Sequence, residues 1–319
     1  MASVLYRWQN AAKAKAHTLL RRWFSQEARA DLKKWQGQAR KRVTRFLPLI
    51  HGTYSAKELI ADLKSRVPED FEILMVHSAF DRMQPMYKGS ALDLLKELVE
   101  YCGPNRTLAM PAFMLGGKLY DKAAYFSSHN FDVKRTPSEM GMLSELFRRW
   151  PGVVRSLHPT HSICAVGPLA EKLTAGHETA LTRTGYGTPF DFMNRHRSTI
   201  VGLGVEYFRC LTHMLTAIDM MDTEYPVPLR RNPIPAVMID VQGNKHNYNV
   251  IIPEGEQSPN NTLLRSLLNG NELKEWKFHG TAMFATQANI VTERLMDAAK
   301  RGITVYGTVA PPNSAGSHS

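Results

Sequence analysis

The fold is decided by residues 71–113, FEILMVHSAFDRMQPMYKGSALDLLKELVEYCGPNRTLAMPAF. The apolar run FEILMV predicts a strand over 71–76, and Ser90 with the amphipathic stretch behind it predicts a capped helix over 90–102. Residues 107–110 predict a second strand. Strands that are apolar throughout and joined by a helix are typical of a parallel sheet covered on both faces. The segment therefore predicts an α/β fold with a central, mostly parallel sheet flanked by helices.

The rest of the chain adds elements to this sheet. Ser55 and Glu58 form a capping-box sequence that starts a helix running to about residue 66. The stretch PAVMIDVQGNKHNYNVII (235–252) predicts a β-hairpin turned at Gly243-Asn244, within a C-terminal part of more β character. Residues 116–135 predict a long polar loop of the kind that serves as a lid or a binding loop. Further strands are expected over 162–166 and 199–203, and helices over 138–150, 169–173, within 185–198, over 262–268 and over 288–301.

The N-terminal 50 residues differ from the rest in charge. They hold 12 Lys and Arg against 2 acidic residues, whereas the other 269 residues carry 28 basic and 27 acidic groups. Apolar residues recur every three or four positions over 2–47, which predicts one or two basic amphipathic helices. Two roles stay open: attachment to an anionic membrane surface or acidic partner, or packing on the chain's own domain or on a second subunit of a homodimer. The predicted domains are 1–50, 51–309 and a disordered tail, 310–319.

Composition excludes several classes of protein. No apolar run approaches the ~18 residues that cross a bilayer, and the N-terminus lacks a secretion signal. The three cysteines, Cys102, Cys164 and Cys210, are far apart, which favours a reducing, cytoplasmic setting. Residues beyond 50 show no basic patch, so nucleic acid is not an expected partner.

Residues 155–167, RSLHPTHSICAVG, gather two histidines, three hydroxyl groups and an arginine. Such a group suits proton transfer, thioester or anion binding, or metal ligation. His158 and His161 lack a third ligand at metal spacing, so no metal site is predicted. Cys210 and His213, three residues apart on a helical pattern, could pair as nucleophile and base, although a single buried cysteine more often packs as a small hydrophobe.

An ordered set of stretches resembles the aminoglycoside 3-N-acetyltransferase family over roughly residues 55–305. The stretches are LMVHSAF (74–80), YKGSALDLLKEL (87–98), GPNRTLAMPAF (103–113), EMGMLSELFRRWPGVVRSLHPTHSICAVGPLA (139–170), GTPFDFM (187–193) and IVGLGVEYFRCLTHMLTAID (200–219). The resemblance implies that family's α/β fold, acetyl-CoA as cosubstrate without a metal, and transfer of an acetyl group to an amine. It also implies a coenzyme-binding wall made of His77, Ser78, Ala79, Phe80, Pro111, Phe113, Arg155, Ser156, His158 and Ser162.

The resemblance places the catalytic base at His213, in a helix motif that reads HxxE in the family. Here the fourth position is Thr216, which can orient an imidazole by hydrogen bonding but adds no charge. A nearby acid, Asp219, Asp222 or Glu224, could take over that task, or the base could be weakened. His161 is the second catalytic candidate, at a position where relatives vary.

Charge bears on the acceptor. An enzyme for polycationic aminoglycosides is expected to present acidic surface, whereas residues 51–319 are nearly neutral. We therefore expect a different acceptor, an amine or hydroxyl of a sugar in polysaccharide biosynthesis, such as a surface-glycan precursor at the inner membrane face. The alternative is a catalytically weak or inactive relative that acts as a membrane- or partner-binding scaffold in glycan assembly.

Overall fold

The computed structural model describes residues 46–114, 122–207, 230–254, 265–304 and 307–308. By its contacts the chain divides into two compact units, Met1–Gly52 and Thr53–Ser319. In the first unit, helix α3 (Leu47–His51) is described, and Phe46, Leu49 and Ile50 are exposed there. The predicted leader helices and tail lie outside these ranges, so the predicted domain boundaries stay a prediction. No helix within these ranges is long and apolar enough to cross a membrane.

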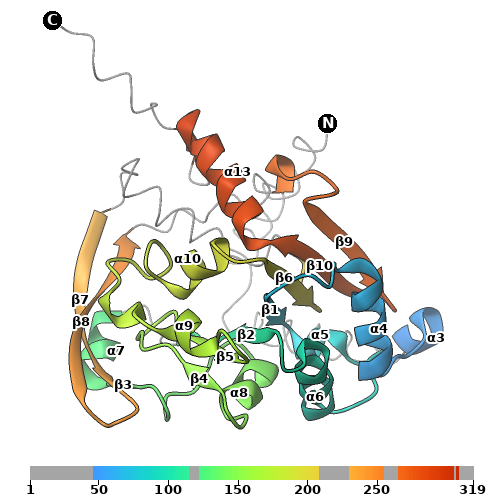
Figure 1. The fold of residues 1–319 in the computed structure, drawn as a ribbon, viewed down its shortest axis with the longest axis horizontal. Coiled ribbons are helices and arrows are strands. Elements are labelled where there is room, and N and C mark those ends of the chain that lie inside the picture. Colours follow the sequence, from blue (N-terminus) through green and yellow to red (C-terminus); the bar gives the residue numbers. More distant parts are fainter. Residues whose placement is uncertain (1–45, 115–121, 208–229, 255–264, 305–306, 309–319) are drawn as a thin grey trace, which may run out of the picture. The chain divides into compact units, whose positions relative to one another are not determined.

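The second unit is built on a seven-stranded sheet in the order β4-β5-β2-β1-β6-β10-β9 (Figure 1). Strand β1 pairs in parallel with both β2 and β6, whereas β5 and β10 run antiparallel to their neighbours. Strands β4 and β9 again point the same way as β1, which confirms the mostly parallel sheet. The strands are β1 (Ile73–Ser78), β2 (Thr107–Pro111), β4 (Val154–Arg155), β5 (Ile163–Val166), β6 (Ser198–Leu203), β9 (Leu273–Phe278) and β10 (Thr281–Gln287).

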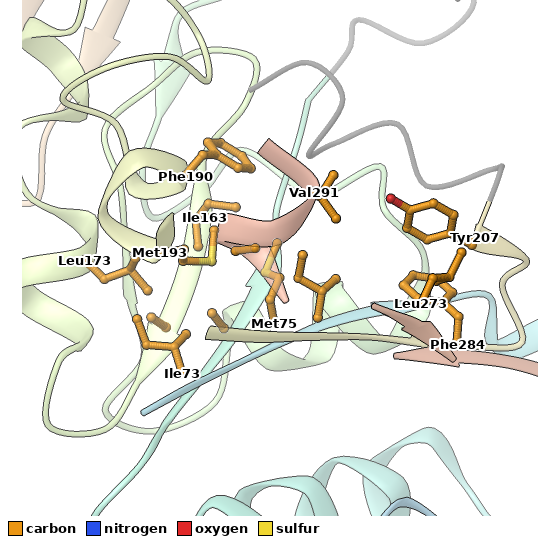
Figure 2. Close-up of a cluster of buried hydrophobic side chains, with 14 of the residues drawn as sticks. Ile73, Met75, Ile163, Leu173, Phe190, Met193, Tyr207, Leu273, Phe284 and Val291 are labelled. Carbon is orange, nitrogen blue, oxygen red and sulfur yellow. The ribbon is translucent and has the colours of Figure 1, made fainter. Parts of the chain in front are cut away.

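Helices cover both faces of the sheet, because alternate side chains of each strand point to opposite faces. Ile73 and Met75 of β1 lie in a buried cluster with side chains of α9 (Ala170–Thr174), α10 (Pro189–Asn194) and α13 (Ala288–Lys300) (Figure 2). Helices α4 (Ala56–Arg66), α6 (Ala91–Cys102) and α8 (Met142–Arg148) pack together on the other face (Figure 1). The buried core thus lies on both sides of β1.

Two predicted helix starts are confirmed in detail. The hydroxyl of Ser55 accepts the backbone N–H of Glu58, and the Glu58 carboxylate accepts the backbone N–H of Ser55. Ser90 and Asp93 form the same reciprocal pair at the start of α6. Such a cap stabilises a helix by about 1 kcal/mol, and here both caps fix elements that cover the sheet.

The predicted loop over 116–135 is in part regular structure. Its described portion holds helix α7 (Lys122–Ser128) and strand β3 (Phe131–Asp132). Strand β3 pairs with β7 (Arg230–Ile239), which forms the predicted hairpin with β8 (Lys245–Glu254). Because this segment adds a strand to a second sheet, the prediction of a plain lid loop was wrong for residues 122–132.

Other differences are local. Helix α8 begins at Met142 rather than 138, because Gly141 has φ 96°, outside the helical region. Strands β9 and β10 form a hairpin, which was not expected from the sequence. Its turn lies at His279 (φ 46°) and Gly280 (φ 75°). The remaining elements are α5 (Phe80–Met83), the 3₁₀ helix η1 (His177–Thr179), β11 (Ile303–Thr304) and β12 (Gly307–Thr308).

Gly202 of β6 leaves no space for a side chain. It lies opposite Phe284, and a Cβ added to it would come within 2.0 Å of the Phe284 ring. We expect Gly202→Ala to lower the free energy of unfolding by at least about 2 kcal/mol, because the buried ring has no room to move. Urea unfolding measures this, and Phe284→Leu in the same chain should recover part of the loss. Equal stability of Gly202→Ala and the parent protein would contradict the packing described.

Candidate functional site

The polar stretch predicted from sequence lies at the carboxyl end of β2. Strand β5 runs antiparallel to β2, so its first residues lie beside the last residues of that strand, with Ile163 opposite Pro111. The N–H of Ala112 donates to the carbonyl of Ser162 (2.9 Å), and that of Met114 to the carbonyl of Thr160 (3.0 Å). Residues 155–162, here called the histidine loop, are thereby attached to the end of β2, where α/β sheets commonly bind ligands.

The end of β1 lies at the same edge of the sheet. His77 is buried opposite Gly202, and the half-buried Ser78, Ala79 and Phe80 follow it. The N–H of Ala79 donates to the carbonyl of Leu203 at the end of β6 (2.9 Å). The predicted coenzyme wall thus comes from neighbouring strand ends.

Arg155 is the clamp of the histidine loop. Its Nε donates to the Ser162 hydroxyl (2.9 Å), and its terminal nitrogens donate to the carbonyls of Thr136 (2.5 Å) and Ala112 (2.6 Å). The guanidinium also lies 4.7 Å from the centre of the Phe131 ring. Burial lowers the Arg155 pKa to about 10, so the group stays charged at neutral pH. It therefore holds the loop, β2 and residues 131–136 together.

His158 shapes the turn of the loop. Its Nδ1 accepts the backbone N–H groups of Thr160 (3.1 Å) and His161 (2.9 Å), and the side chain is fully enclosed. Because Nδ1 is an acceptor, the proton of this neutral imidazole lies on Nε2. The His158 side chain consequently stabilises the turn by bonding two backbone groups of its own loop.

His161 lies next to the end of β2. Its ring centre is 4.7 Å from that of Phe113, and its Nδ1 lies 2.8 Å from the Thr160 hydroxyl. The side chain is buried, with 6% of its surface exposed. The loop therefore holds the second catalytic candidate against the predicted coenzyme wall.

The sequence analysis missed His177, in η1. Its Nδ1 lies 2.9 Å from the Ser156 hydroxyl, its Nε2 lies 2.9 Å from the carbonyl of Arg183, and its ring stacks on His158 with centres 4.3 Å apart. Tyr248 of β8 also contacts His158, with ring centres 5.1 Å apart. Local sequence carries no signal for the contacts of His177 with the loop, because His158 and Ser156 are 19 and 21 residues away in the chain.

Burial keeps three histidines neutral. Desolvation lowers the pKa of His77 and of His177 to about 4. The pKa of His158 falls well below its ordinary value of 6.5, by desolvation and then by the charges of His177, His161 and Arg183.

These shifts predict a loss of stability in mild acid. The unfolded chain takes up protons at its histidines near pH 6.5, whereas the folded chain does so only near pH 4. The free energy of unfolding should therefore fall between pH 6.5 and 4.5, by roughly 1 kcal/mol per pH unit for each buried histidine. Urea unfolding at a series of pH values measures the slope.

Two variants test which histidines cause that slope. His77→Leu should reduce the dependence of the free energy of unfolding on pH, by the contribution of about one proton taken up on unfolding. His129→Asn, which replaces an exposed histidine, should leave that dependence unchanged. A flat profile for the parent protein would contradict the burial of neutral imidazoles.

The structure brings most of the predicted site residues together. Those attached to the end of β2 are Pro111, Phe113, Arg155, Ser156, His158, His161 and Ser162, and those at the end of β1 are His77, Ser78, Ala79 and Phe80. His213 and Thr216 lie in 208–229, which the structure does not describe. Within the described ranges, no three His, Cys, Asp or Glu side chains are grouped so as to hold a metal ion.

The described site offers neutral imidazoles, hydroxyl groups and backbone amides at one edge of the sheet. Such groups can accept a proton or donate hydrogen bonds to a carbonyl or an oxyanion. Arg155 carries the positive charge of the histidine loop, but three of its nitrogens already bond to protein oxygens. The arrangement therefore suits hydrogen bonding to an uncharged reacting group.

Comparison with solved structures shows the same fold. Aminoglycoside acetyltransferase AAC(3)-Xa superimposes with a TM-score of 0.67 at 20% identity, covering 83% of this chain and 99% of that one. A binary complex of AAC-IIIb with CoASH gives a TM-score of 0.66 at 20% identity, covering 81% and 100% of the two chains. At these identities the likeness concerns the fold alone.

Comparison of sequences shows the family. Aminoglycoside N(3)-acetyltransferase IV from Salmonella sp is 32% identical over 118 residues, which are 36% of this chain and 41% of that protein. The chain spans about half the length of the curated relatives that it matches, 41% and 57% for two of them. Residues 75–297 match the aminoglycoside 3-N-acetyltransferase family, well over half of the chain. Together with the fold, this match shows that the chain belongs to the aminoglycoside 3-N-acetyltransferase family.

Proposed function

We propose that the protein is an acetyl-CoA-dependent acetyltransferase that transfers the acetyl group directly to an amine or hydroxyl in a ternary complex. The observation that carries the proposal is the attachment of the histidine loop to the end of β2, in a chain of this family. A related solved structure binds CoASH, which supports acetyl-CoA as the cosubstrate. Holding both reactants in place lowers the barrier by making the attack effectively intramolecular.

In this proposal His213 removes a proton from the acceptor, which attacks the thioester carbonyl. Backbone amides and the half-buried Ser78 hydroxyl stabilise the oxyanion that forms. When this intermediate collapses, the carbon–sulfur bond breaks, and the CoA thiolate leaves and takes up the proton from His213. The Ser162 hydroxyl has a different task, because it donates to the carbonyl of Ala112 (2.8 Å) and accepts from Arg155. Arg155, Ser156, His158 and Ser162 serve the coenzyme site by fixing its wall.

The proposed acceptor is a sugar amine or hydroxyl in a glycan precursor. Support comes from the near-neutral charge of residues 51–319, because a polycationic acceptor favours acidic surface. Thiol release from acetyl-CoA is the assay, with aminoglycosides, free amino sugars and nucleotide-linked amino sugars as parallel acceptors. Turnover with a glycan precursor and none with an aminoglycoside is expected; preference for the aminoglycoside would overturn the proposed acceptor.

We further propose that the first unit binds an anionic membrane surface from the cytoplasm. Residues 1–50 carry a net charge of +10. Phe46, which precedes α3, and Leu49 and Ile50 within it are exposed, with 82% of Leu49 accessible. Apolar side chains beside basic ones bind lipid surfaces by burial and by charge together, and each basic group adds about 1 kcal/mol.

Co-sedimentation with vesicles tests the membrane proposal. The full chain should bind phosphatidylglycerol vesicles and not phosphatidylcholine vesicles. Leu49→Asp with Ile50→Asp should weaken binding by at least about tenfold, whereas Leu181→Asp, an equally exposed position in the second unit, should not. Equal binding by the double variant and the parent protein would refute the proposal.

A further inference from the structure

We infer that His177 is a positioning residue for acetyl-CoA binding, because it fixes the histidine loop through its contacts with Ser156 and His158. The inference rests on the proposed function, since it assigns the loop to the coenzyme site. It concerns a residue that contacts the loop from another element, η1.

The hydrogen bonds of His177 define one protonation state. The Ser156 hydroxyl oxygen accepts the backbone N–H of Ile163 (2.9 Å), which leaves its own hydrogen to donate to His177 Nδ1. The carbonyl of Arg183 can only accept, so Nε2 carries the ring proton and donates to it. His177 is thus a neutral imidazole with both nitrogens used, in a completely buried position.

Contacts continue from His177 to the surface of the site. Its ring stacks on His158 with planes 24° apart, which fixes the plane in which His158 Nδ1 accepts two backbone N–H groups. Those two groups belong to Thr160 and His161, and the His161 ring contacts Phe113. A shift of the His177 ring therefore moves the turn that holds His161.

His177 also joins the loop to a second segment. Its bond to the carbonyl of Arg183 fixes residues 180–188, whose first carbonyl, that of Ala180, accepts from the Tyr248 hydroxyl (3.0 Å). The Tyr248 ring also contacts His158, in a T-shaped arrangement with planes 71° apart. The His158 ring therefore contacts two aromatic side chains, His177 and Tyr248, and each of them is bonded to the same segment.

Matched variants separate the two bonds of His177. His177→Phe keeps the ring and loses both hydrogen bonds, whereas His177→Asn places an amide oxygen near the position of Nδ1 and keeps the acceptor for Ser156. His196→Asn is the control, because His196 also stacks on an aromatic ring (Phe192, 4.0 Å) and bonds to a carbonyl, but it lies at the end of α10.

Two measurements are made on the full chain: acetyl-CoA affinity by calorimetry, and imidazole ¹⁵N chemical shifts of His158 and His161 by NMR. His177→Phe should weaken acetyl-CoA binding about tenfold and change the imidazole ¹⁵N chemical shifts of both His158 and His161. His177→Asn should stay within about twofold of the parent affinity, and His196→Asn should change neither quantity. If His177→Phe does not fold, Ser156→Ala removes the same bond from the other side and takes its place.

The outcomes distinguish this inference from the proposed function. Unchanged shifts and affinity in a folded His177→Phe, even with a lower melting temperature, would mean a merely structural histidine and overturn the inference. Equal losses in the Phe and Asn variants would overturn the role of the Ser156 bond. If the parent protein does not bind acetyl-CoA, the proposed function fails, while the shifts still decide whether His177 positions the loop.

Discussion

His213→Ala is expected to slow acetyl transfer by about 10²–10⁴-fold, which is what a positioned general base contributes. Acetyl-CoA binding should be unchanged, because the base acts on the acceptor rather than on the coenzyme. Thiol release with a productive acceptor measures the first quantity and calorimetry the second. Turnover equal to that of the parent protein would show that another group, such as His161, removes the proton.

Thr216→Glu tests the missing carboxylate of the HxxE motif. A carboxylate one helical turn from His213 would orient the imidazole and raise its basicity, which threonine cannot do. A large gain in turnover is expected if the parent enzyme is weak for this reason. Robust turnover in the parent protein would instead eliminate the alternative of a non-catalytic scaffold.

Arg155→Ala is expected to lower the free energy of unfolding by at least about 3 kcal/mol. The substitution removes the Arg155 donors to the Ser162 hydroxyl and to the Thr136 carbonyl, and one of the two donors to the Ala112 carbonyl. It also leaves a cavity against Phe131. Urea unfolding measures the loss. Arg155→Lys should recover only part of it, because an ammonium group cannot reproduce the planar arrangement of three nitrogens.

Arg149→Ala is the matched control for Arg155. Arg149 also bonds to the protein, to the Glu145 carboxylate, but 67% of its side chain is exposed, so its loss should change stability little. If Arg155→Ala were as stable as Arg149→Ala, the clamp described for the histidine loop would not exist.

Local signals predicted the elements that local chemistry determines. The Ser90 cap and apolar periodicity located α6, and the continuous apolar run located β1, although that strand begins two residues later than predicted. These features depend on residues within one or two turns of each other, so a single sequence contains them. The same holds for the β7–β8 hairpin and its Gly243 turn.

Contacts between residues far apart in the chain could not be predicted from the sequence. Nothing near Ile163 shows that β5 runs antiparallel to β2, yet this direction is what carries the histidine loop to the end of β2. The β9–β10 hairpin was missed because its turn uses His279 with positive φ, where Asn or Gly is the usual signal. His177 was missed because its function as a packing partner of His158 exists only in the folded chain.

Calorimetric titration of the full chain with acetyl-CoA tests the account most directly. We expect saturable binding of one acetyl-CoA per chain, weakened by His177→Phe and unaffected by His213→Ala. Absence of binding at millimolar acetyl-CoA, in a protein that unfolds cooperatively, would contradict the assignment of this site to acetyl transfer.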